Sequence, residues 1–173
     1  KPVIISTGMS TIKEIKRTLK FYKKKIGNVA LLHCVSNYPC SLKSINLNSL
    51  RILKFFFKCT IGFSDHTKGN QASCLSVALG SKIIEKHFTL DKNMKGPDHK
   101  ASCNPTELEK LIKDLRKTEI ILGQHVKKKQ HEEEEMSKIS RKSLYYAKHL
   151  KKNSTIKENY LVALRPGFGV SPM

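Results

Sequence analysis

The sequence predicts an α/β fold in which parallel strands are covered by helices. Four short apolar runs, rich in β-branched residues, recur along the first half of the 173-residue chain. The stretches between them and after the last carry apolar residues every three or four positions, as on one face of a helix. Strands that alternate with helices run parallel, and runs that are apolar on both faces are typical of strands buried on both sides. The alternation alone leaves a doubly wound sheet and a barrel open.

The first strand–helix unit shows the pattern. Val3–Ser6 predicts a strand. Thr11 and Glu14 lie three residues apart and predict a capping box at the start of the following helix, and Gly27 predicts its end. The apolar stripe of this helix consists of Ile12, Ile15, Leu19, Tyr22 and Ile26.

Three further units follow. Their strands are predicted at Val29–Val35, Cys59–Phe63 and Lys82–Thr89. Their helices are predicted within Ile45–Phe57, at Ala72–Leu79 and after Asn104. Asn104 supplies a cap for the last helix, Pro105 a first-turn proline and Glu107 an early carboxylate.

The pattern changes after the fourth unit. Residues 127–142 carry runs of Lys and Glu and predict a charged linker or a solvated helix. Beyond them, Lys142–Ala147 and Tyr160–Leu164 predict two strands that flank a polar turn at Lys151–Ser154. The chain therefore starts a second, β-rich element.

The charge of the chain is strongly positive. Lys and Arg number 33 against 14 Asp and Glu, for a formal net charge of +19. Such an excess permits binding to nucleic acid or an anionic surface. Five of the 33 are Arg, however, and nucleic-acid interfaces depend on Arg for bidentate contacts. The charge therefore favours lysine-rich solvated surfaces and makes nucleic acid an unlikely partner, although a basic binding protein stays an alternative.

Other compositional features favour a cytoplasmic protein. No apolar run approaches the roughly 20 residues that a membrane span needs, and the start of the chain lacks the features of a signal peptide. The five cysteines include no Cys-x-x-Cys pair, which argues against a disulfide framework and a zinc–thiolate site.

Polar residues follow the predicted strands at their carboxyl ends. In barrel enzymes the catalytic groups lie at that face and come from several strands. We therefore expect one site built from successive strand ends, which favours the barrel. The residues concerned include Ser6, Ser36, Ser64, His66, His87 and Asp98.

His66 and His87 are the best candidates for metal ligands, because they would come from adjacent strands. Two neutral imidazoles suit a divalent transition metal, and an open coordination position would polarise a substrate carbonyl. Spacing alone also allows His87 to be a hydrogen-bonded interior residue and Asp65 to be a helix cap. His33 lies earlier in its strand and is expected to be a core histidine.

Several sequence strings together resemble the bacterial N-acetylneuraminate (sialic acid) synthase family, which includes legionaminic acid synthases. Their order and spacing match across essentially the whole chain. The strings are KPVIISTGMST at the start, LLHCVSNYP at 31–39, GFSDHT at 62–67, VALGSKIIEKHFTLDK at 77–92, GPDHKAS at 96–102, RKSL at 141–144 and RPGFGVSP at 165–172.

The resemblance implies a (β/α)₈ barrel followed by a small antifreeze-like (SAF) domain, in domain-swapped homodimers. It also implies condensation of phosphoenolpyruvate with an N-acylated amino sugar, such as N-acetylmannosamine, to give a nonulosonic acid and phosphate. A divalent metal is implied, first manganese, with magnesium or cobalt as alternatives.

The resemblance also implies roles for single residues. His66 and His87 would ligate the metal that polarises the sugar aldehyde, and Asp98 and Tyr38 would hold the sugar. Arg165 would reach the acylamido group from the partner subunit. The phosphoenolpyruvate pocket would be lined by Ser6, Ser36 and Ser64; some family members carry Asn in place of Ser36.

The length departs from that of the family. A complete barrel has eight strands and about 250 residues, whereas about four strands are predicted here. We therefore expect the C-terminal half of the barrel at 1–126, a charged linker at 127–140 and an incomplete SAF domain at 141–173. Such a chain is a fragment of a longer enzyme or a truncated gene product, inactive alone; a noncatalytic remnant stays an alternative.

Overall fold

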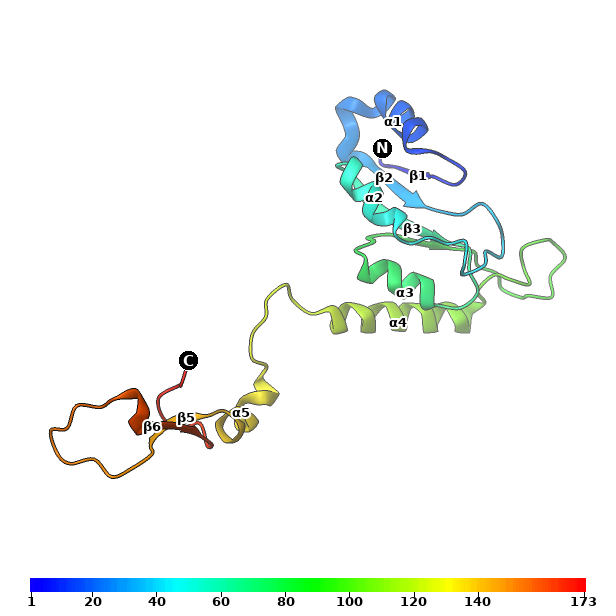
Figure 1. The fold of residues 1–173 in the computed structure, drawn as a ribbon. Helices are drawn as coiled ribbons and strands as arrows, with labels where there is room; N and C mark the ends of the chain where they lie inside the picture. The colour runs from blue at the N-terminus through cyan, green and yellow to red at the C-terminus, as the bar shows by residue number, and fades with distance from the viewer. The chain divides into compact units, whose positions relative to one another are not determined.

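The computed structural model describes the backbone of residues 1–173 and all side chains except those of residues 23–25. The chain divides into two units, Lys1–Gly123 and Gln124–Met173 (Figure 1), and each is described by itself. None of the helices in the described part of the chain is long and apolar enough to cross a bilayer.

The first unit is built on one parallel sheet, which confirms the predicted α/β fold. The strands lie in the order β1-β2-β3-β4, so each pairs with its neighbour in sequence. Their bounds are Val3–Ser6 for β1, Val29–His33 for β2, Thr60–Asp65 for β3 and Ile84–Lys86 for β4.

Helices cover one face of this sheet, with α3 and α4 side by side along it (Figure 1). The hydrophobic core lies between the strands and the helices, where Leu31 and Phe63 from the sheet meet Leu50 and Leu53 from α2. The helices are α1 at Ile12–Leu19, a 3₁₀ helix η1 at Lys20–Asn28, α2 at Ser49–Phe56, α3 at Gln71–Ala78 and α4 at Pro105–Leu122.

The predicted helix starts are confirmed. Thr11 and Glu14 form a complete capping box on α1, and Asn104 and Glu107 form another on α4. The predicted end at Gly27 was wrong for an α-helix, because the chain continues from α1 as the 3₁₀ helix η1. Apolar spacings of three and four residues fit both helix types, so the pattern could not separate them.

Three strands end at other residues than predicted, and the first of them, β2, ends at His33 rather than at Val35. β3 extends through Ser64 and Asp65 rather than ending at Phe63. Both polar side chains are buried and have hydrogen-bond partners, and these partners offset the cost of removing them from water. β4 is shorter than predicted, with an isolated bridge from Phe88 to Cys103 beyond it.

The second unit contains one antiparallel pair of strands, β5 at Ser143–Tyr146 and β6 at Leu161–Leu164, as predicted. The charged stretch before it includes a short helix, α5 at Glu134–Ser140, which agrees with the solvated-helix interpretation. Two short 3₁₀ helices complete the unit, η2 at His131–Glu133 and η3 at Glu158–Tyr160.

Candidate functional site

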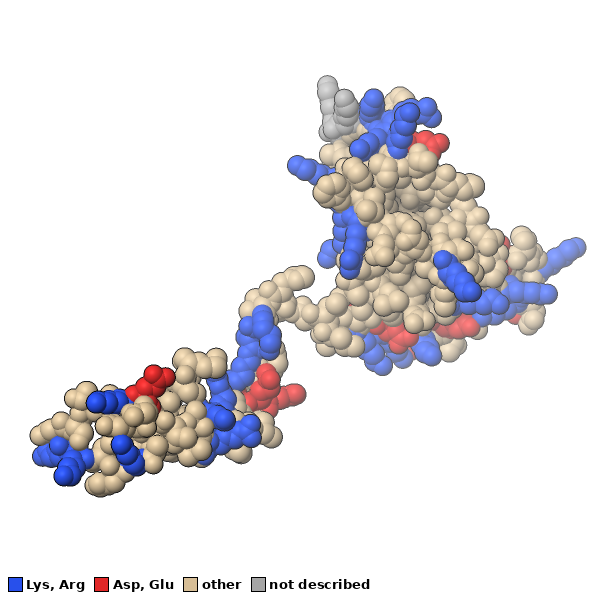
Figure 2. All heavy atoms as spheres, in the orientation of Figure 1, with Lys and Arg blue, Asp and Glu red and all other residues tan. Residues whose placement is uncertain are grey.

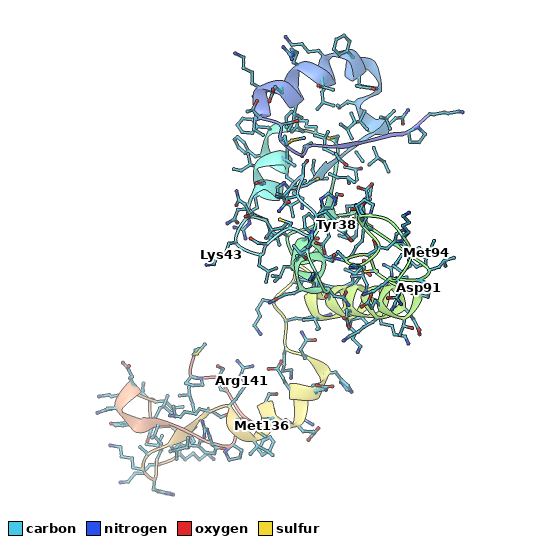
Figure 3. All side chains as sticks on the ribbon, turned by 90° about the vertical axis from the view of Figure 1, so that its right-hand side faces the viewer. Tyr38, Lys43, Asp91, Met94, Met136 and Arg141 are labelled. Carbon is cyan, nitrogen blue, oxygen red and sulfur yellow. The ribbon has the colours of Figure 1, made fainter. Side chains whose placement is uncertain are left out.

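Three rings converge at the carboxyl ends of β2, β3 and β4. The Tyr38 ring stacks on the His87 ring, with centroids 4.0 Å apart and planes at 18°. The His66 ring lies nearly perpendicular to both, with its centroid 5.2 Å from that of His87 and 5.4 Å from that of Tyr38. Parallel strands bring their carboxyl ends to one edge, which places these residues together although they are far apart in sequence. Tyr38 is labelled in Figure 3.

The hydrogen bonds of His66 leave one ring nitrogen available. Nδ1 lies 2.8 Å from the carbonyl oxygen of Val35, and because a carbonyl accepts only, Nδ1 carries the proton. In the neutral ring Nε2 then has a free lone pair. Its neighbour at 3.5 Å is Ser64 Oγ, which donates to Glu85 Oε1 at 2.6 Å. A histidine fixed through Nδ1 with its other nitrogen open is the usual arrangement of a metal ligand.

Glu85 belongs to this cluster, although the sequence analysis gave it no role. Its carboxylate accepts the Ser64 hydroxyl, one strand away. Side chains two residues apart on a strand point to the same face, so Glu85 lies on the face of His87. That alternation was available in the sequence and could have identified it.

Asp65 and Lys86 lie on the opposite face of the same strands. Lys86 Nζ lies 2.9 Å from Asp65 Oδ2 and also donates to the carbonyl of Thr67. Asp65 is fully buried and accepts from the hydroxyls of Thr67 and Ser73. Asp65 is not the cap of α3, since Asn70 holds the N-cap position of that helix. Its buried hydrogen bonds instead fix the end of β3 next to His66.

Asp98 lies beside the rings on the loop after β4. Its Oδ2 is 3.6 Å from His87 Nδ1, and its side chain is half exposed. In the same loop the Ser102 hydroxyl lies 3.5 Å from the Tyr38 hydroxyl. The loop therefore touches two of the three rings and leaves the Asp98 carboxylate open to a ligand. Asp91 and Met94, labelled in Figure 3, lie in its exposed first part.

The structure places the remaining predicted residues outside this cluster or in the other unit. Ser6 is exposed at the end of β1, two strands from β3. Ser36 is also exposed and lies against Gly8, where a methyl group would overlap its hydroxyl. Arg165 is exposed in the second unit, after β6. His33 is a core residue as expected, because Nε2 bonds to the Ile45 carbonyl at 2.7 Å and the ring stacks on Phe63.

Burial raises the pKa of two groups near the rings. It raises the pKa of the Tyr38 hydroxyl, and the hydrogen bond between Tyr38 and Ser102 opposes this only in part. It also raises the pKa of the Cys34 thiol at the end of β2. Both groups are therefore neutral at pH 7, and the cysteine is not an activated nucleophile.

A divalent metal fits the two histidines but would need further ligands. Among the described side chains, no three His, Cys, Asp or Glu residues converge as a complete metal cage. His66 and His87 offer two imidazoles, and a site of that kind leaves coordination positions for water or substrate oxygen. The donor set thus suits a divalent transition metal that also binds a ligand.

Two named relatives align with this chain over its whole length or nearly so. The chain is 44% identical over 176 residues to the N,N'-diacetyllegionaminic acid synthase of Campylobacter jejuni subsp. jejuni, an alignment that covers 100% of this chain and 53% of the relative. It is 39% identical to the synthase of the same name from Legionella pneumophila, over 99% of this chain and 49% of the relative. The chain therefore spans about half the length of the curated relatives it matches.

Solved structures and a family model agree. The crystal structure of an N-acetylneuraminic acid synthetase from Leptospira borgpetersenii matches with a TM-score of 0.72 and 39% identity, over 78% of this chain and 47% of that one. A spore coat polysaccharide biosynthesis protein E from Chromobacterium violaceum has a TM-score of 0.83 at 20% identity, over 96% and 50%, and supports the fold alone. The NeuB family model matches residues 1–127. The parallel sheet is thus half of a synthase-type barrel, and the chain belongs to the NeuB family of the sialic acid synthase type.

Proposed function

We propose that this chain forms the C-terminal half of a synthase that condenses phosphoenolpyruvate with an N-acylated amino sugar. The products are a nonulosonic acid and phosphate. The observation that carries the proposal is the convergence of Tyr38, His66 and His87 with Glu85 at the carboxyl end of the sheet. Two relatives are named N,N'-diacetyllegionaminic acid synthases, which supports this substrate class.

His66 and His87 would hold the metal, preferably manganese, which supplies a Lewis acid for the sugar aldehyde when bound. Tyr38 stacks on His87 and fixes the plane of its ring. Asp98 is placed to accept hydrogen bonds from sugar hydroxyls, since its carboxylate lies beside His87 and is half exposed. Glu85 holds the Ser64 hydroxyl and provides a carboxylate that can exchange a proton at the same place.

Ser6 and Ser36 would contribute to the phosphoenolpyruvate pocket together with Ser64, and the second unit would begin a SAF domain. In a domain-swapped homodimer Arg165 would then contact the sugar bound by the partner subunit. A barrel needs eight strands, so we expect activity only when the remaining strands are present.

The test uses the native polypeptide that contains residues 1–173. His66→Ala and His87→Ala should each weaken manganese binding, measured by calorimetry, and reduce condensation by at least about a hundredfold. His125→Ala, an exposed histidine in the second unit, is the matched control and should change neither. Normal manganese affinity and turnover in the His66→Ala/His87→Ala double variant would overturn the assignment.

A further inference from the structure

A lysine-rich cleft of about 490 Å³ lies next to α3 and α4, the helices on one face of the sheet. It is bordered by the start of α3, the first half of α4 and the loop between β4 and α4. Lys86 lines it, and because side chains alternate along a strand, Lys86 faces away from Glu85 and His87. Figure 2 shows Lys and Arg atoms gathered at this end of the first unit. The lysines that line the cleft are Lys68, Lys86, Lys92, Lys100 and Lys110.

The acidic groups of the cleft leave part of this charge uncompensated. Glu107 pairs with Lys92 at 2.6 Å, and Asp114 accepts a hydrogen bond from the Asn70 amide at 2.9 Å. Lys86 is held by the buried Asp65. The other three lysines, Lys68, Lys100 and Lys110, form no ion pair with any described side chain. Their ammonium groups are therefore free to meet an anion.

The start of α3 adds to the positive potential. Asn70 occupies the N-cap position, yet its side chain does not cap the helix and donates to Asp114 instead. Gly69 and Asn70 line the cleft, so the uncapped end of the helix opens toward it. Free N–H groups and the helix dipole at such an end favour a negatively charged ligand.

We propose that this cleft binds a small ligand that carries two or more linked phosphate groups, such as pyrophosphate or a nucleoside triphosphate. Its volume is in the range of small-molecule sites and larger than one phosphate requires. Three unpaired lysines match a multiply charged anion better than a singly charged one. The cleft and the ring cluster share one lining residue, Ser102, whose hydroxyl lies 3.5 Å from that of Tyr38. The ligand would bind beside the sugar and phosphoenolpyruvate and not in their place, because the lysines that line the cleft do not belong to the ring cluster.

The first test is calorimetric titration of pyrophosphate and of ATP into the native polypeptide that contains this chain, without metal. Each titration is made once without and once with excess phosphoenolpyruvate. The variant Lys68→Ala/Lys100→Ala/Lys110→Ala should lower the affinity about tenfold or more, because it removes the three cations that the anion would contact. The control Lys13→Ala/Lys43→Ala/Lys58→Ala removes the same charge from exposed positions outside the cleft and should change it less than about twofold. If pyrophosphate binds as tightly as ATP, the phosphate groups account for all of the affinity. If ATP binds more tightly, the nucleoside adds contacts of its own.

A second test needs no variant. Lysine acylation followed by mass spectrometry should show that pyrophosphate protects Lys68, Lys100 and Lys110 more than the control lysines. Three results would each overturn the proposal: no binding of either ligand, equal loss in both triple variants, or displacement by phosphoenolpyruvate. These readouts do not depend on condensation activity, so they fail independently of the proposed synthase function.

Discussion

The two units of this chain hold their strands together by different means. In the first, β2 and β3 are central strands of a parallel sheet, and side chains such as Leu32 and Phe63 are fully buried. In the second, β5 and β6 form a single antiparallel pair. Among the described residues of this unit, Ser143 is the one whose side chain is fully buried. Large apolar side chains there remain exposed, among them Met136, Ile139, Phe168 and Val170.

This difference separates a unit stabilised by burial from one stabilised mainly by backbone pairing. Each large apolar side chain removed from water contributes about 1.5–3 kcal/mol to the free energy of unfolding. The first unit buries many such side chains, and the second buries hardly any. A two-stranded sheet alone is marginally stable in water. The second unit is therefore expected to need a covering surface, as the SAF domain of the proposed dimer would find on its partner.

The largest expected effect of this difference is in amide hydrogen exchange. Amides of β2 and β3 should exchange only through global unfolding of the unit, with a free energy of opening of about 5 kcal/mol or more. Amides of β5 and β6 should exchange at least about a thousandfold faster. Exchange followed by mass spectrometry measures both units in one sample, and equal protection in the two units would contradict the comparison.

The next effect concerns the buried ion pair of the first unit. Asp65→Ala leaves the Lys86 ammonium buried without its partner and should lower the free energy of unfolding of this unit by about 3–5 kcal/mol. Glu109→Ala is the matched control, because it breaks an exposed pair with Lys113 and should cost less than about 1 kcal/mol. Urea denaturation followed by circular dichroism gives both values. If the two variants cost the same, the burial of the pair has no energetic role.

The sequence predicted the elements that depend on local chemistry. The capping boxes at Thr11 and Asn104 could be predicted because they use contacts three residues apart. The strands could be predicted because apolar runs report burial directly. The 3₁₀ helix η1 could not, since its apolar spacing also fits an α-helix.

The site was predicted less completely. Parallel topology implied that His66 and His87 would be neighbours, and they are. The contact between Ser64 and Glu85 depends on strand register, which a single sequence does not fix. For the same reason the sequence could not show that Asp65 pairs with Lys86 across two strands. Such contacts between strands can be identified only once the pairing of the strands is known.

A smaller effect is expected from the helix cap of α4. Asn104→Ala removes the side chain that accepts from the Glu107 amide and should lower the free energy of unfolding by about 1 kcal/mol. Asn48→Ala is the control, because Asn48 holds the N-cap position of α2 without a side-chain cap bond. Thermal denaturation should therefore shift for Asn104→Ala alone, and an equal shift in both would show that cap bonds do not stabilise this unit.

The smallest expected effect is the pH dependence of the same helix start. The hydrogen bond from Lys92, together with that from the Asn104 amide, lowers the pKa of Glu107 below its ordinary 4.5. Because the folded pKa lies below the unfolded one, the stabilisation is complete above pH 4.5 and is lost as the pH falls through the folded pKa. Solvent screens this exposed pair, so the loss should stay below about 1 kcal/mol.

Glu107→Gln tests the pH effect without removing the cap, since Gln can also fill the last position of a capping box. The free energy of unfolding should be measured in urea at pH 7 and pH 3 for both proteins. The first unit should lose less stability on acidification in the variant than in the wild type. The second unit, in which Glu107 does not take part, should respond identically in both. An unchanged acid loss in the first unit would show that the Lys92 pair contributes nothing to its stability.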